Sequence, residues 1–230
     1  SLGLTDIDSP AGMLRAGSYQ ETGGTISVSG SGSDIWYDAD QFNYAYRPLT
    51  GDGEIIARVT SQPNTDGWAK AGPMIRQSLT PSSAHAMLQM TGGNGVQFQY
   101  RASDGAFMSA QSGSGSVSPR WLRLVRQGNQ LLSYEAPDGN TWTPVGQVTI
   151  PMSNTVYIGF AITSHNTSAL GTATFDNVLI TSTSPAPTPT PTLVPTNTPL
   201  PTNTPVPPTA TPTRTNTPVP PTPTNTPVPP

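Results

Sequence analysis

The chain of 230 residues carries 13 acidic and 10 basic side chains, which give a formal net charge of −3 and an isoelectric point of 5.1. No basic stripe is present to neutralise a phosphate backbone, so the composition argues against nucleic acid as a partner. The sequence has no cysteine, which excludes disulfides and thiol chemistry, and no apolar run near the roughly 20 residues of a membrane span, which argues against membrane insertion.

Two segments of unlike composition divide the chain. The segment from Pro185 to Pro230 holds 18 of the 27 prolines, a single charged residue and no aromatic residue or glycine, and it repeats "TNTP". Proline fixes φ and removes an amide donor, so this segment favours solvated polyproline II. We expect one folded domain over residues 1–182 and a Thr/Pro-rich linker or stalk over 183–230. Its threonines are candidates for O-glycosylation.

Short alternating segments separated by glycine-rich turns run through the first 182 residues. The predicted strands are "TISVSGSG" (25–32), "GEIIARVTS" (53–61), "AGPMIRQSL" (71–79), "HAMLQMT" (85–91), "VQFQYRA" (96–102), three strands within 120–145, "TVYIGFAITS" (155–164) and "TATFDNVLIT" (172–181). "GGNG" between the fourth and fifth of these is a hairpin signal. About ten to twelve short strands without a helical period predict an all-β fold, an antiparallel two-sheet jelly-roll sandwich.

Several stretches together resemble a known bacterial family. They are "GSGSDIWYDADQFNYAYRPLTGDGEIIARV", "NTDGWAKAGPMIRQSL", "GVQFQYR", "WLRLVRQGN", "APDGNTW", "VYIGFAITSHN" and "TATFDNVLI". They are similar to the concanavalin A-like lectin/glucanase jelly rolls that accompany secreted glycoside hydrolases, some of which are catalogued only as domains of unknown function. The resemblance covers residues 1–182 and implies a two-sheet jelly roll, a secreted setting and a role in carbohydrate binding. The tail resembles the Thr/Pro linkers of multidomain bacterial exoproteins.

Aromatic and polar side chains in this part of the chain suit sugar recognition, because aromatic faces stack on pyranose rings while amides and cations bind hydroxyl groups. The segment "DIWYDADQF" supplies two aromatic residues, "NTDGWAK" supplies a tryptophan and a lysine, and alternation places three polar residues of "VQFQYR" on one face. The candidate carbohydrate-binding residues are Trp36, Tyr37, Trp68, Lys70, Arg76, Gln97, Gln99 and Arg101. The alternative for each is an ordinary solvated surface position.

Four aspartates are candidates for a structural Ca²⁺ site. Asp34, Asp38 and Asp40 lie within "DIWYDADQF", and Asp176 in "FDNV" is a candidate fourth ligand. Calcium takes six to eight oxygen ligands, and jelly rolls of the family that the chain resembles often carry a structural calcium. The alternative is a turn in which the aspartates bind backbone amides.

Catalytic motifs are sparse. Glucanases on this architecture need two carboxylates flanking the scissile bond, yet the chain has only Glu21, Glu54 and Glu135 as glutamates, without an E-x-D-x-x-E strand. His85 and His165 are the only histidines, and we expect both to be hydrogen-bonded residues at strand ends. The prediction is that the protein is not an enzyme.

These observations predict an extracellular, secreted or cell-surface, non-catalytic carbohydrate-binding module that the Thr/Pro linker tethers to a larger protein. Its partner would be a polysaccharide or another glycan. The first alternative is a structural or adhesive subunit whose partners are copies of itself or neighbouring domains. The second alternative is a glycoside hydrolase.

Overall fold

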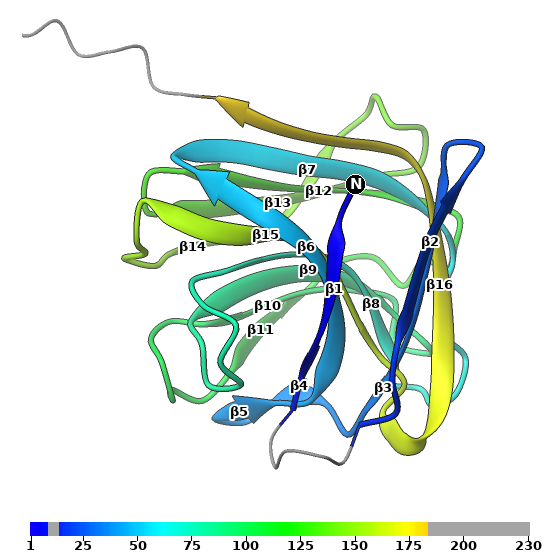
Figure 1. The fold of residues 1–230 in the computed structure, drawn as a ribbon. Helices are drawn as coiled ribbons and strands as arrows, with labels where there is room; N and C mark the ends of the chain where they lie inside the picture. Colours follow the sequence, from blue (N-terminus) through cyan, green and yellow to red (C-terminus); the bar gives the residue numbers. More distant parts are fainter. Residues whose placement is uncertain (9–13, 184–230) are drawn as a thin grey trace, which may run out of the picture. The chain divides into compact units, whose positions relative to one another are not determined.

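The computed structural model describes residues 1–8 and 14–183 (Figure 1). Most of the predicted Thr/Pro-rich linker therefore lies outside the described residues. Within the part of the chain that is described, all regular structure is β, and no helix is long and apolar enough to cross a membrane.

Two seven-stranded antiparallel sheets make up the domain. Sheet A contains, in order across the sheet, β1 (Gly3–Ile7), β6 (Phe42–Thr50), β15 (Thr155–Thr163), β8 (Lys70–Arg76), β9 (His85–Thr91), β10 (Val96–Arg101) and β11 (Ser109–Ser112). Sheet B contains β14 (Thr143–Thr149), β13 (Gln130–Ala136), β12 (Arg120–Gln127), β7 (Asp52–Ser61), β16 (Asn166–Thr183), β3 (Thr25–Gly32) and β2 (Ser18–Thr22). A separate small hairpin pairs β4 (Ile35–Trp36) with β5 (Ala39–Asp40).

The predicted all-β antiparallel jelly-roll sandwich is confirmed. "GGNG" joins β9 to β10 as an antiparallel hairpin, and the stretch 120–145 forms β12, β13 and the start of β14. The predicted strands did not include β1, β2, β4, β5, β6 or β11. In β11 all four residues are exposed, and none is a large apolar residue that would mark a buried face.

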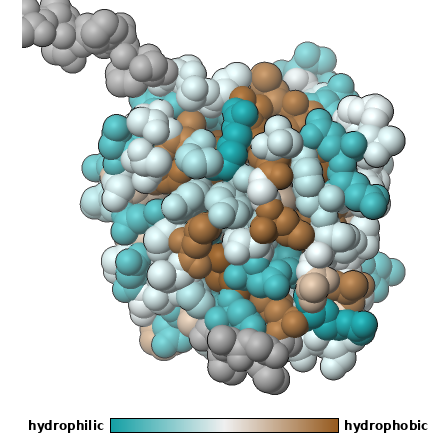
Figure 2. All heavy atoms as spheres, viewed as in Figure 1, coloured by the Kyte–Doolittle hydropathy of each residue, from teal (hydrophilic) through white to brown (hydrophobic). Residues whose placement is uncertain are grey.

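The main core lies between the two sheets and follows the alternation of the strands. Ile55, Ala57 and Val59 of β7 are fully buried, as their spacing on one face predicts. Phe160 of β15 stacks on Phe175 of β16, with ring centroids 4.1 Å apart, so this pair joins sheet A to sheet B. Apolar residues reach the surface only in separate patches among polar residues on the face drawn in Figure 2.

Sheet A is also covered on its outer face, the face turned away from sheet B. Every residue of β8 and β9 is buried, which is the pattern of a strand packed on both faces. Met74 of β8 and Met87 of β9 pack with Ile35 of β4 in a second apolar cluster. The β4–β5 hairpin thus lies against the outer face of sheet A, on the side away from sheet B (Figure 1).

Candidate functional site

A cavity of about 340 Å³ opens beside the β4–β5 hairpin on the outer face of sheet A. Its volume lies at the lower end of the range of roughly 300–1,000 Å³ for small-molecule sites. The lining residues are Asp34, Trp36, Tyr37, Trp68, Lys70, Gln97, Ala110 and His165. The structure therefore brings together five of the eight residues that the sequence predicts for sugar binding, from three separate parts of the chain.

The loop before β8 holds Trp68 at the rim of the cavity. The Asp66 carboxylate accepts a hydrogen bond of 2.7 Å from the amide of Trp68, which fixes the turn. The β9–β10 turn supports this loop, because the side-chain amide of Asn94 donates to the carbonyl of Gly67 at 2.8 Å. Trp68 is 43% exposed as a result, so its indole is available to a ligand.

Acidic and basic side chains alternate along one side of the cavity. The buried ammonium group of Lys70 forms an ion pair with Asp34 and lies 5.9 Å from the ring centroid of Trp68. His165 lies between two carboxylates, with Nε2 3.4 Å from Asp34 and Nδ1 3.2 Å from Asp66. These contacts join the loop before β4, the loop before β8 and the turn after β15.

Two cavity residues have strained backbones. Tyr37 has φ of 52° and His165 has φ of 54°, and a third non-glycine residue with positive φ in the described ranges, Asn177, lies elsewhere. A positive φ in a bulky residue costs energy and persists only where surrounding contacts hold it. Tyr37 is 64% exposed beside the cavity, although its ring is mostly apolar.

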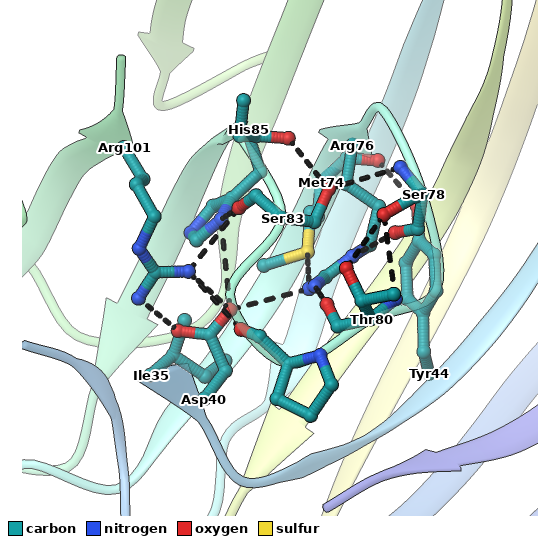
Figure 3. Close-up of polar contacts among 12 residues, drawn as sticks. Ile35, Asp40, Tyr44, Met74, Arg76, Ser78, Thr80, Ser83, His85 and Arg101 are labelled. Carbon is teal, nitrogen blue, oxygen red and sulfur yellow. Dashed lines mark hydrogen bonds and ion pairs between the residues drawn. The ribbon is translucent and has the colours of Figure 1, made fainter. Parts of the chain in front are cut away.

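A buried ionic cluster holds the β4–β5 hairpin on sheet A (Figure 3). Arg101 of β10 donates two hydrogen bonds to the carboxylate of Asp40, at 2.7 and 2.8 Å. Arg76 of β8 reaches the same carboxylate at 3.4 Å and stacks over Phe42, 5.1 Å from the ring centroid. All three charged side chains are fully buried, so two guanidinium groups share one carboxylate away from water.

Arg101 also binds the backbone of the β4–β5 hairpin. Arg101 Nη2 donates to the carbonyl oxygens of Trp36 and Tyr37, at 3.3 and 3.1 Å. The side-chain amide of Gln99 donates a hydrogen bond of 2.9 Å to the backbone carbonyl of Ile35. Sheet A therefore positions the backbone from which the two aromatic residues of the hairpin extend.

Three of the residues predicted for sugar binding need a correction. Arg76, Gln99 and Arg101 are fully buried and hold the hairpin instead of facing an open groove. The alternation correctly places Gln97, Gln99 and Arg101 on one face of β10, opposite Phe98 in the core, but the hairpin covers two of them. Of these three residues of β10, only Gln97 lines the cavity.

The four aspartates predicted for calcium do not come together. Asp34 pairs with Lys70, Asp40 with Arg101, and Asp176 on sheet B with Arg58, whose hydrogen bond lowers the pKa of Asp176. No group of three or more acidic or histidine side chains suited to a metal ion occurs in residues 1–8 and 14–183. A single site built on all four is therefore wrong, while calcium binding by fewer of them stays a prediction.

The glutamates lie away from the cavity. Glu54 pairs with Arg123 at 2.7 Å, Glu135 pairs with Arg120 at 2.8 Å, and Glu21 accepts a hydrogen bond from Tyr19 at 2.9 Å. All three belong to strands of sheet B. The carboxylate that lines the cavity is instead that of Asp34, and Asp66 contacts the opposite nitrogen of the lining residue His165.

Comparison with known proteins supports the fold. No family model matches the chain, and a search of curated protein sequences finds no match. A protein of unknown function from Saccharomyces cerevisiae has a TM-score of 0.58 at 17% identity, over 73% of this chain and 93% of its own. The carbohydrate-binding module CBM66 from Bacillus subtilis has a TM-score of 0.50 at 16% identity, over 78% of this chain and 96% of its own.

Part of a larger protein has a similar fold. The GH43 protein BlXynB (K247S mutant) from Bacillus licheniformis has a TM-score of 0.53 at 13% identity, over 69% of this chain. The chain spans about a third of that protein's length, since the match covers 33% of it. At such identities these likenesses show the fold alone.

Replacing Asp40 tests the ionic cluster. Asp40→Asn leaves two buried guanidinium groups without a counter-charge, so we expect the free energy of unfolding to fall by about 3–5 kcal/mol in urea denaturation. Asp176→Asn is the matched control at a partly exposed ion pair, where the loss should be much smaller. Equal losses in the two variants would contradict the role given to Asp40.

The buried histidine of this cluster predicts a pH dependence of stability. His85 Nδ1 lies 3.0 Å from the carbonyl of Ser83, and desolvation by burial lowers the pKa of His85 to about 4, with Asp40 opposing and the two arginines adding to the effect. The unfolded chain takes up this proton near pH 6.5, but the folded chain takes it up only near pH 4. Above pH 6.5 His85 is neutral in both states and does not lower the free energy of unfolding. As the pH falls from 6.5 towards 4, only the unfolded chain takes up the proton, so the free energy of unfolding falls by up to about 3 kcal/mol.

Urea denaturation between pH 7 and pH 4 measures this contribution against the variant His85→Gln. The variant should lose less stability over this range than the original protein, whatever its stability at pH 7. Parallel pH profiles would show that His85 does not titrate in this way.

Proposed function

We propose that this protein is a non-catalytic carbohydrate-binding domain and that the cavity beside the β4–β5 hairpin is its binding site. The observation that carries the proposal is the gathering of Trp36, Tyr37 and Trp68 around the polar side chains of Lys70 and Gln97. Aromatic rings next to hydrogen-bond donors and acceptors match a sugar ring, which has apolar faces and a rim of hydroxyl groups.

The charge balance of the cavity favours a neutral glycan. Its ammonium group, on Lys70, is matched by Asp34, and the imidazole of His165 lies between two carboxylates. An acidic sugar would therefore find no unmatched cation among the lining residues and would meet the carboxylate of Asp34. A neutral sugar meets no such repulsion. Its hydroxyl groups are able to bind the further N–H donors of Lys70 and the further lone pairs of Asp34.

The likenesses support the proposal at the level of the fold, since CBM66 is named as a carbohydrate-binding module and BlXynB as a GH43 protein. In this proposal the domain is extracellular, and its Thr/Pro-rich segment tethers it to a larger protein. Tethering raises the effective concentration at a surface, so weak binding by a single cavity still retains the attached protein there.

Two observations define the alternatives. Asp34 and Asp66 contact opposite nitrogens of His165 at the cavity, which is the arrangement that a glycoside hydrolase function would have to use. A structural or adhesive subunit would instead bind copies of itself through exposed apolar residues such as Phe107, which is 73% exposed. Release of reducing sugar identifies the first alternative, and concentration-dependent sedimentation identifies the second.

A binding assay with aromatic substitutions tests the proposal. We expect the protein to be retained on at least one of cellulose, xylan, mannan, arabinan, β-glucan and fructan. Trp36→Ala and Trp68→Ala should each weaken this binding by about tenfold, since loss of a stacked ring costs roughly 1 kcal/mol or more. Trp142→Ala is the control, a half-buried tryptophan that does not line the cavity.

The assay is run with added calcium and again with a chelator, because loss of binding in the chelator would show that a calcium ion is needed at the site, for which Asp34 and Asp38 remain the candidate ligands. Retention on none of the six polysaccharides would contradict carbohydrate binding. Equal binding by the Trp68→Ala and Trp142→Ala proteins would remove the site from this cavity.

A further inference from the structure

The β4–β5 hairpin decides which part of a glycan the cavity is able to hold, an inference that rests on the proposed function. The outer face of sheet A would otherwise offer a groove running across its strands. Segment 33–41 fills that face over β8, β9 and the end of β10. The groove is therefore interrupted, and the cavity is what remains on one side of the hairpin.

The interruption is a fixed part of the fold. Ile35 is fully buried among Phe42, Tyr44 and Met87, so the hairpin contributes its own apolar residue to the cluster on sheet A. The amide of Asp40 donates to the carbonyl of Pro81 at 3.0 Å, in addition to the ion pairs of its carboxylate. Moving the hairpin aside would expose Ile35 and separate Asp40 from Arg101, so we expect no ligand to open the groove.

The lining residues show where the hairpin closes the cavity and where an exposed strand lies beside it. Trp36 and Tyr37 bound the cavity on the hairpin side. Trp68 lies in the loop before β8 and His165 in the turn after β15, and the contacts of His165 with Asp34 and Asp66 hold these segments together. Ala110 belongs to β11, the last strand of sheet A, and every residue of β11 is exposed. A chain is thus able to leave the cavity over β11 but not to continue past the hairpin.

We propose that the cavity binds the terminal residue of a neutral glycan chain, with the rest of the chain leaving over β11. A site of this kind recognises chain ends and short oligosaccharides. An open groove, in contrast, binds several consecutive sugars in the interior of a chain and gains affinity with each sugar that it contacts.

Chain length and the number of chain ends test this proposal with the full chain. The probe is the polysaccharide that retains the protein in the panel, cut to different extents with an endo-acting hydrolase, together with its purified oligosaccharides of two to six units. The Kd should change by less than about threefold between the trimer and the hexamer, and the binding capacity per unit mass should rise with the number of chain ends. The Trp68→Ala protein gives the background.

Other outcomes separate this proposal from the function on which it rests. An affinity that rises by tenfold or more from trimer to hexamer, with a capacity that follows mass and not chain ends, would overturn terminal binding and leave carbohydrate binding intact. Retention on no polysaccharide would overturn both. Reduction of the reducing end to an alditol then assigns the bound end, because binding persists only if the cavity holds the non-reducing end.

Discussion

The buried carboxylate of Asp40 is the group on which the candidate site depends. It is the shared counter-charge for Arg101 and Arg76, and all three side chains are removed from water. Burying charges is costly, so such a cluster is stable only when the geometry and the additional hydrogen bonds are good. Here Arg101 binds the carboxylate through two hydrogen bonds and uses its remaining donors on backbone carbonyls. Loss of the carboxylate would leave the arginines uncompensated and release the hairpin.

This cluster connects the core to the surface. Sheet A packs on sheet B with one face and on the hairpin with the other, so a residue such as Met74 is as buried as the core residue Ile75 beside it. The hairpin in turn presents Trp36 and Tyr37 towards the loops that carry Trp68 and His165. The aromatic residues thus stand on a backbone that polar side chains of the sheet hold in place, which limits the entropy lost when a ligand binds.

The sequence predicts the fold well because alternation reports which residues share a face, and strands such as β7 and β13 show this clearly. The aromatic residues of the cavity were also predictable, since Trp36, Tyr37 and Trp68 lie in polar, glycine-containing stretches where a core role is disfavoured. Alternation does not report what covers a face. Arg76, Gln99 and Arg101 therefore resembled an open polar surface, and Asp40, the partner of the two arginines, resembled a metal ligand. The Arg101–Asp40 pair joins residues that are 61 positions apart in the sequence, so alternation within a strand does not reveal it.

The central claim is that a neutral glycan binds in the cavity between the hairpin and the Trp68 loop. The four tryptophans allow one direct measurement, because each indole N–H gives its own NMR signal and only Trp36 and Trp68 line the cavity. Titration with an oligosaccharide of the retained polysaccharide should shift the signals of Trp36 and Trp68 to saturation and leave those of Trp121 and Trp142 in place. Saturable shifts confined to Trp121 or Trp142 would contradict the account, because they would place the ligand on another surface.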